Sequence, residues 1–211
     1  PSEAVQGSRG LIFPNMREAL IRELPFDPSS VPYEDRVGGC DPGYSPDPCV
    51  LWTGFYIGGH LYLSDFWRKN ETMAADRAEA LHEGHTYYVD PPEHVEQREL
   101  RIAAQSANRH CRIIAAPRHK RPGEDCARVE LLMVQQLLRE GRLHVLYTVA
   151  AQLIVECDTL AWDEKTGKAD DRRTPDCGHF DSIKALTYVV MGATERVVIK
   201  PKADEGMSLS R

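Results

Sequence analysis

The sequence lacks the features that would mark a membrane protein, a secreted disulfide protein or a protein that coats nucleic acid. No window approaches the roughly 18 apolar residues of a membrane span, and the polar stretch 1–10 lacks the apolar region of a signal peptide. The six cysteines include no CxxC pair, which favours reduced thiols. A strongly basic balance is also absent, because 26 Lys and Arg face 32 Asp and Glu, for a formal net charge of -6.

A phosphate-binding loop of the G-x-x-x-x-G-K-[ST] type is missing as well. Thr166, Gly167 and Lys168 form a similar ending, but the upstream glycine is not there. We therefore expect no ATP hydrolysis by this chain alone. The negative net charge remains compatible with an enzyme that uses carboxylates to hold metal cations. In such an enzyme, the charge near the active site matters more than the net charge of the chain.

The length of 211 residues and the hydrophobic fraction of 42% suit one domain with a full core. The start at Pro1 suggests a piece of a longer protein. We predict a linker or N-terminal extension over 1–34, with one short amphipathic helix at 16–24, then a domain over 35–195 and a flexible tail over 196–211.

Hydrophobic periodicity predicts the order of elements inside the domain. Strands are expected at 37–40, 50–57, 60–67, 86–89, 111–115 and 143–145, and helices over 71–83, 95–108, 126–140, 149–159 and 180–191. Gly58 and Gly59 separate two strands as a hairpin turn, and an exposed β-hairpin is expected over 162–173. This order predicts an α/β fold, a mixed β-sheet with helices on both faces. It is the ribonuclease H-like arrangement, although the order alone does not exclude other α/β folds.

Two of the expected helices have a predicted inward face. The helix over 71–83 should bury Met73, Ala74, Ala78 and Leu81. The helix over 126–140 should bury Val129, Leu132, Met133, Gln136 and Leu137.

Three aspartates stand at the ends of predicted elements. Asp41 follows the first strand and precedes Pro42-Gly43, Asp90 follows the fourth strand, and Asp181 lies near the start of the last helix. The first and fourth strands are neighbours in a ribonuclease H-like sheet, and the ends of adjacent central strands form a natural site. Three converging carboxylates repel one another unless cations are bound. Oxygen ligands suit Mg²⁺ or Mn²⁺, and two such ions can activate a water for attack on a phosphodiester.

Each aspartate also has a structural interpretation. Asp41 could be a turn residue, Asp90 could only end a strand, and Asp181 could be a helix N-cap. Their order and their common position at element ends favour the site.

The motifs around these aspartates resemble those of the nuclease domain of tailed-bacteriophage large terminases. GCDPGYS at 39–45 is similar to the first acidic motif, YVD at 88–90 to the second and GHFDSIKAL at 178–186 to the third, while GLIFP at 10–14 resembles the segment that joins ATPase to nuclease. The likeness runs from about residue 10 to about residue 192.

The resemblance implies a metal-dependent endonuclease of the ribonuclease H-like superfamily, located in the host cell cytoplasm. It would cut double-stranded viral concatemer DNA with little sequence specificity during packaging, using two divalent cations, Mg²⁺ or Mn²⁺. The metal-ligand role falls on Asp41, Asp90 and Asp181, with Asp176 or His179 as auxiliary residues. The implied partners are DNA, the portal, the small terminase subunit and the ATPase domain that this chain lacks; no membrane is implied.

Two basic segments are candidates for DNA contact. They are a loop with Arg118, His119, Lys120 and Arg121, and the expected hairpin with Lys165, Lys168, Arg172 and Arg173. The structural alternative for both is a solvated charged loop.

Two other functions remain open. A Holliday-junction resolvase or transposase-type nuclease would use the same acids but prefer branched DNA. A non-catalytic module that docks on DNA or portal would bind normally without Asp41 and Asp90.

Overall fold

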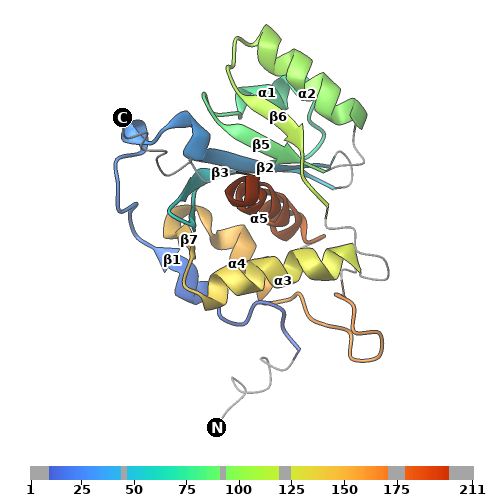
Figure 1. The fold of residues 1–211 in the computed structure, drawn as a ribbon. Coiled ribbons are helices and arrows are strands. Elements are labelled where there is room, and N and C mark those ends of the chain that lie inside the picture. Colours follow the sequence, from blue (N-terminus) through green and yellow to red (C-terminus); the bar gives the residue numbers. More distant parts are fainter. Residues whose placement is uncertain (1–9, 44–46, 91–93, 119–124, 171–178, 200–211) are drawn as a thin grey trace, which may run out of the picture.

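The chain folds around one mixed sheet of seven strands (Figure 1). The computed structural model describes residues 10–43, 47–90, 94–118, 125–170 and 179–199. The strand order is β1-β7-β4-β3-β2-β5-β6. The strands are β1 (Leu20–Ile21), β2 (Arg36–Pro42), β3 (Cys49–Ile57), β4 (His60–Lys69), β5 (Thr86–Val89), β6 (Arg112–Ala115) and β7 (Leu143–Leu146).

The sheet combines an antiparallel meander with parallel flanks. Strands β2, β3 and β4 pair antiparallel in sequence, and Gly58 and Gly59 at the β3–β4 turn have φ of 57° and 86°, as the Gly-Gly signal predicts. Strand β5 lies parallel to β2 and β6 lies parallel to β5, while β7 lies parallel to β4. The predicted adjacency of the strands that precede Asp41 and Asp90 is therefore confirmed.

Helices cover both faces of this sheet, as the element order predicts (Figure 1). One face packs against α1 (Ala74–Glu79) and α2 (His94–Ser106), and Ala78 of α1, Leu100 of α2 and Leu81 just after α1 are buried there. The other face carries α3 (Cys126–Arg139), α4 (Ala151–Cys157) and α5 (Asp181–Ile199), which form the larger core. No helix among the described residues is long and apolar enough to cross a membrane.

Helix α5 lies directly against the central strands because small residues permit a close approach. A Cβ atom on Gly39 of β2 would stand 2.2 Å from the carbonyl oxygen of Ala185. Trp52 of β3 is fully buried, and its indole Nε1 donates a hydrogen bond of 2.8 Å to the carbonyl of Ser182. These contacts fix the first turns of α5 over the end of β2.

The predicted helix at 16–24 is wrong. A short 3-10 helix covers Met16–Ala19, and Leu20 and Ile21 then pair with β7 as the edge strand β1. An edge strand depends on the backbone of its neighbour, which local periodicity does not report. Ile12 and Phe13 are buried in the larger core, so part of the segment expected as a linker packs onto the domain.

The predicted inward faces of two helices are also wrong in part. In α3 the buried residues are Leu131, Val134 and Leu137, whereas Leu132 and Gln136 are exposed. Apolar residues occur on several sides of this helix, so periodicity alone does not select the face. Helix α1 is shorter than expected, and Met73 before it is 66% exposed.

Two C-terminal features differ from their predictions. The hairpin expected over 162–173 is, in its described part, a turn closed by the single bridge between Trp162 and Ala169. Helix α5 continues to Ile199, beyond the predicted end at 191 and into the expected tail. The rest of that tail, 200–211, lies outside the described residues.

Candidate active site

Asp41 and Asp90 lie at the same edge of the sheet. Cys40 and Val89 are partners in the parallel β2–β5 pair, so the aspartate that follows each one emerges at the carboxyl end of its strand. Burial, together with the nearby carboxylates of Asp181 and Asp90, raises the pKa of Asp41 to about 7, although Lys184 lowers it. The three predicted acids therefore lie close enough to interact electrostatically.

Asp181 is the first residue of α5 and is only 1% exposed. Its Oδ1 atom lies 3.5 Å from Nζ of Lys184, one turn further along the helix. Its Oδ2 atom is buried and has no hydrogen-bond partner among the described residues. Burial raises the pKa of this carboxyl. A buried carboxylate oxygen without a donor is a costly arrangement that a bound cation would relieve.

Two further residues border the acids. Asp47, just before β3, lies with Oδ2 3.6 Å from Nδ1 of His179, which the sequence suggested as an auxiliary residue. Asp47 was not predicted, and it raises the pKa of both Asp41 and Asp181. The other suggested auxiliary residue, Asp176, lies outside the described residues.

Asp90 is held by groups from two helices and a loop. Arg118 donates to Oδ1 of Asp90 at 2.9 Å, and Gln97 of α2 donates to its backbone carbonyl at 2.7 Å. Buried Tyr188 of α5 hydrogen-bonds the Asp90 side chain, and burial raises the pKa of its hydroxyl far above the usual value. Burial also raises the pKa of Glu130 in α3 to about 6, although nearby Arg118 lowers it.

A buried glutamate sets the start of α5. Glu156 of α4 is fully buried and accepts hydrogen bonds from the backbone nitrogens of Ser182 at 3.3 Å and Ile183 at 3.0 Å. The Ser182 hydroxyl donates to the same carboxylate. These donors are the free N–H groups of the first helical turn, where a negative charge is favourable. Glu156 thereby fixes the turn that carries Asp181.

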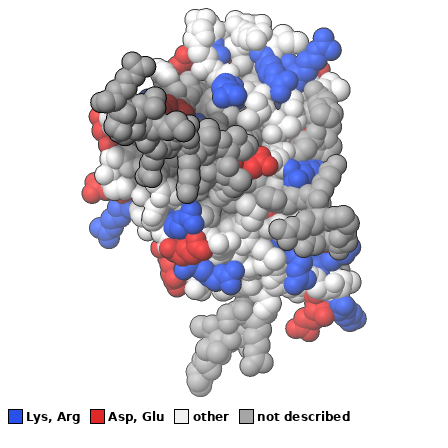
Figure 2. Space-filling view, in the orientation of Figure 1, with Lys and Arg blue, Asp and Glu red and all other residues white. Residues whose placement is uncertain are grey.

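The predicted DNA-binding residues lie in different situations. Arg118 is paired with Asp90, while Lys165 and Lys168 are exposed on the turn closed by Trp162. The remaining candidates, His119, Lys120, Arg121, Arg172 and Arg173, lie outside the described residues. Figure 2 shows basic and acidic side chains interspersed over the described part of one face.

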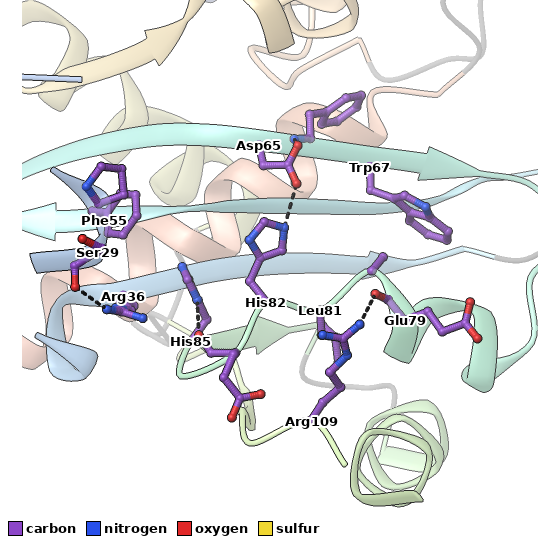
Figure 3. A pocket seen from close by; sticks show the side chains of 14 residues that line it. Ser29, Arg36, Phe55, Asp65, Trp67, Glu79, Leu81, His82, His85 and Arg109 are labelled. Atoms are coloured by element: carbon purple, nitrogen blue, oxygen red, sulfur yellow. Dashed lines mark hydrogen bonds and ion pairs between the residues drawn. The ribbon is translucent and has the colours of Figure 1, made fainter. Parts of the chain in front are cut away.

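A cleft of about 600 Å³ lies away from these aspartates (Figure 3). It is bordered by Asp65 and Trp67 of β4 and by His82 and His85 after α1, and His82 pairs with Asp65 at 2.8 Å. Burial lowers the pKa of His85 to about 4. Asp41, Asp90 and Asp181 do not border this cleft.

In the described part of the chain, no three His, Cys, Asp or Glu side chains stand in a ready-made arrangement for one metal ion. The ammonium of Lys184 lies among the carboxylates and supplies the positive charge there. Asp41, Asp181 and Asp47 are thus gathered around this lysine, whereas Asp90 is paired with Arg118.

Comparison with known proteins identifies the fold. No protein-family model and no curated protein sequence matches the chain. Its structure is similar to the large terminase nuclease domain of P22, with a TM-score of 0.66 and 18% identity over 89% of this chain and 93% of that chain. It is also similar to the large terminase nuclease domain of bacteriophage SPP1 with bound Mn, with a TM-score of 0.55 and 19% identity over 85% of this chain and 97% of that one.

A third similar structure is the large terminase nuclease of the thermophilic phage G20c with bound magnesium. The TM-score is 0.57 with 15% identity, over 87% of this chain and 97% of that one. The predicted ribonuclease H-like α/β fold is thus confirmed as the fold of terminase nuclease domains. At these identities, the likeness concerns the fold and leaves the activity to be argued from the site.

Proposed function

We propose that this chain is the nuclease domain of a phage large terminase, a metal-dependent endonuclease that cuts double-stranded concatemer DNA with little sequence specificity. The observation that carries the proposal is the gathering of Asp41, Asp90 and Asp181 at one sheet edge of this fold. The similar nuclease domains with bound manganese or magnesium support it.

The residues present fit two divalent cations, Mg²⁺ or Mn²⁺. The ligand set is carboxylate oxygen, which these hard cations prefer. Burial disfavours the ionised form of Asp41, and Oδ2 of Asp181 has no hydrogen-bond partner among the described residues, so a bound cation would stabilise the negative charge of both. We assign Asp41, Asp90 and Asp181 as ligands, with His179 beside them.

When bound, such cations would supply Lewis-acid stabilisation of the scissile phosphate and activation of the attacking water. The side chains around the acids have positioning roles. Arg118 and Tyr188 orient Asp90, and Glu156 fixes the helical turn that presents Asp181. Close packing of α5 on β2 at Gly39 keeps Asp181 near Asp41.

The motor context belongs to the same proposal. An ATPase domain in the same protein, the portal and the small terminase subunit would be the partners, in the cytoplasm of the infected cell. The DNA backbone would be held by the 118–121 loop and by Lys165 and Lys168, with Arg172 and Arg173.

Cleavage of supercoiled plasmid tests the proposal. The protein is incubated with Mn²⁺, Mg²⁺ or EDTA beside Asp41→Asn, and Asp158→Asn serves as control because Asp158 is an exposed acid paired with Arg17. We expect nicking and linearisation that require a cation and fall by about two orders of magnitude or more in Asp41→Asn, since one metal ligand is lost.

The other outcomes distinguish the alternatives. A marked preference for four-way junctions over linear duplex would favour a resolvase. Absence of cleavage, with DNA or portal binding unchanged in Asp41→Asn, would replace the nuclease by a docking module.

A further inference from the structure

Lys184 lies among the aspartates that we propose as metal ligands. Its Nζ atom is 3.5 Å from Oδ1 of Asp181, and its side chain is 43% exposed. Partial burial lowers the pKa of Lys184, but Asp41, Asp181 and Asp47 outweigh burial and raise it. The ammonium is therefore bound electrostatically to a cluster of carboxylates and not to Asp181 alone.

Lys184 in turn affects the ionisation of the aspartates around it. Burial raises the pKa of Asp41 and of Asp181, and Lys184 is the principal group that lowers both. Without that positive charge, the carboxylates of Asp41, Asp181 and Asp47 would repel one another more strongly. Lys184 thus stabilises the ionised acids in the metal-free chain.

We infer that Lys184 is an internal counter-cation that competes with divalent cations for Asp181 and Asp41. The inference rests on the proposed function, because it concerns the same acidic site. A divalent ion bound to Asp181 would lie close to the ammonium beside its Oδ1 atom, and the two positive charges repel each other at short range. Lys184 therefore keeps the empty site folded and weakens the binding of metal.

The structure offers the displaced side chain another position. Lys184 also borders a small cavity of about 100 Å³ between α3 and α5. Glu130 and Thr187 line the same cavity, so a carboxylate and a hydroxyl are available to the ammonium there. A rotamer that turns the Lys184 side chain into this cavity would take the ammonium away from Asp181.

Direct measurement of Mn²⁺ binding tests the inference without relying on cleavage. The metal-free protein, Lys184→Met and Arg22→Met are titrated with MnCl₂ by calorimetry, with free Mn²⁺ followed by electron paramagnetic resonance. Arg22 is exposed beside the edge strand β1, four strands from β2, so its variant removes one positive charge elsewhere. We expect Kd to fall about tenfold in Lys184→Met, because a nearby repulsive charge is removed, and to stay unchanged in Arg22→Met.

Thermal unfolding gives a second readout. Lys184→Met should unfold at a lower temperature than the wild type in EDTA and gain more from saturating Mn²⁺, since tighter binding stabilises the folded state more. Lys184→Gln repeats the comparison if Lys184→Met fails to fold.

An equal or weaker Mn²⁺ affinity in the Lys184 variants would overturn this inference and leave the proposed metal site intact. Absence of saturable Mn²⁺ binding in every protein, including the wild type, would instead overturn the proposed metal site together with the inference.

Discussion

The backbone nitrogen of Ile183 lies 3.0 Å from Oε2 of Glu156 and donates a hydrogen bond to it. The contact joins α4 to the first turn of α5, beside Asp181. Glu156 is fully buried, and burial raises the pKa of its carboxyl, although four hydrogen bonds to the carboxylate lower that pKa. A structural contact between two helices is therefore also a determinant of the acidic site.

Glu156→Ala should destabilise the protein by about 2–4 kcal/mol, because two backbone donors and the Ser182 hydroxyl lose a charged acceptor in the core. Glu156→Gln should lose less, since its amide oxygen still accepts. Urea unfolding measures both. Mn²⁺ affinity measured on the folded Gln variant tests the positioning role: unchanged affinity would limit Glu156 to a role in stability.

Gly39→Ala should destabilise the protein by about 2–3 kcal/mol, since the added Cβ would lie 2.2 Å from the Ala185 carbonyl oxygen and must push α5 away from β2. Mn²⁺ affinity should fall as well, because Asp181 moves away from Asp41.

Gly141→Ala is the control for this variant. Gly141 has φ of 63° and open space around it, so only backbone strain of about 1 kcal/mol is expected. Equal unfolding free energies for the two variants would mean that the contact between Gly39 and α5 is not tight.

The positions of the acids could be predicted because each one follows from local signals. Asp41 is followed by Pro42-Gly43 and Asp90 by a proline pair, which predict the end of a strand close to each acid. Strand β2 in fact continues through Asp41 to Pro42, and β5 ends at Val89, just before Asp90. The ribonuclease H-like order then made their strands neighbours, which the pairing of β2 with β5 confirms.

The groups around the acids depend on tertiary packing and could not be predicted in the same way. Tyr188 reaches Asp90 because of the rotation of α5 about its axis, and Glu156 reaches the first turn of α5 because of the position of α4. No local sequence pattern encodes either arrangement. Lys184 did carry a signal, because it stands three residues after Asp181, a spacing at which opposite charges meet on a helix.

The stability of the metal-free protein should decrease as the pH rises from about 4 to 7. The pKa of Asp41 is raised, chiefly by burial, from 3.8 to about 7 in the folded chain, so the folded state holds a proton that the unfolded state has released. The stabilisation that comes from protonated Asp41 is complete below pH 4 and is lost as the pH rises through 7. For this one group, the free energy of unfolding falls by up to about 1.4 kcal/mol per pH unit.

Urea unfolding in EDTA at pH 5, 6, 7 and 8 measures this dependence. Asp41→Asn imitates the protonated acid and should show a shallower dependence, whereas parallel curves for the two proteins would exclude Asp41 as its source. Mn²⁺ affinity of the wild type should rise over the same range, because the cation must displace the proton.

Replacing Lys120 and Arg121 together by Ala should weaken the binding of duplex DNA and flatten its dependence on salt. Each phosphate contact that is lost reduces the slope of log K against log salt by about 0.9, so the double variant should lose up to about 2. Fluorescence anisotropy at several salt concentrations measures the slope.

Arg22→Ala with Arg139→Ala removes two exposed positive charges elsewhere and controls for total charge. If this control flattens the slope as much as the loop variant, the attraction is a general property of the surface charge. If only the loop variant flattens it, the phosphate contacts belong to the segment that follows Arg118. That residue already pairs with Asp90, so the loop would then join the bound DNA directly to one of the proposed metal ligands.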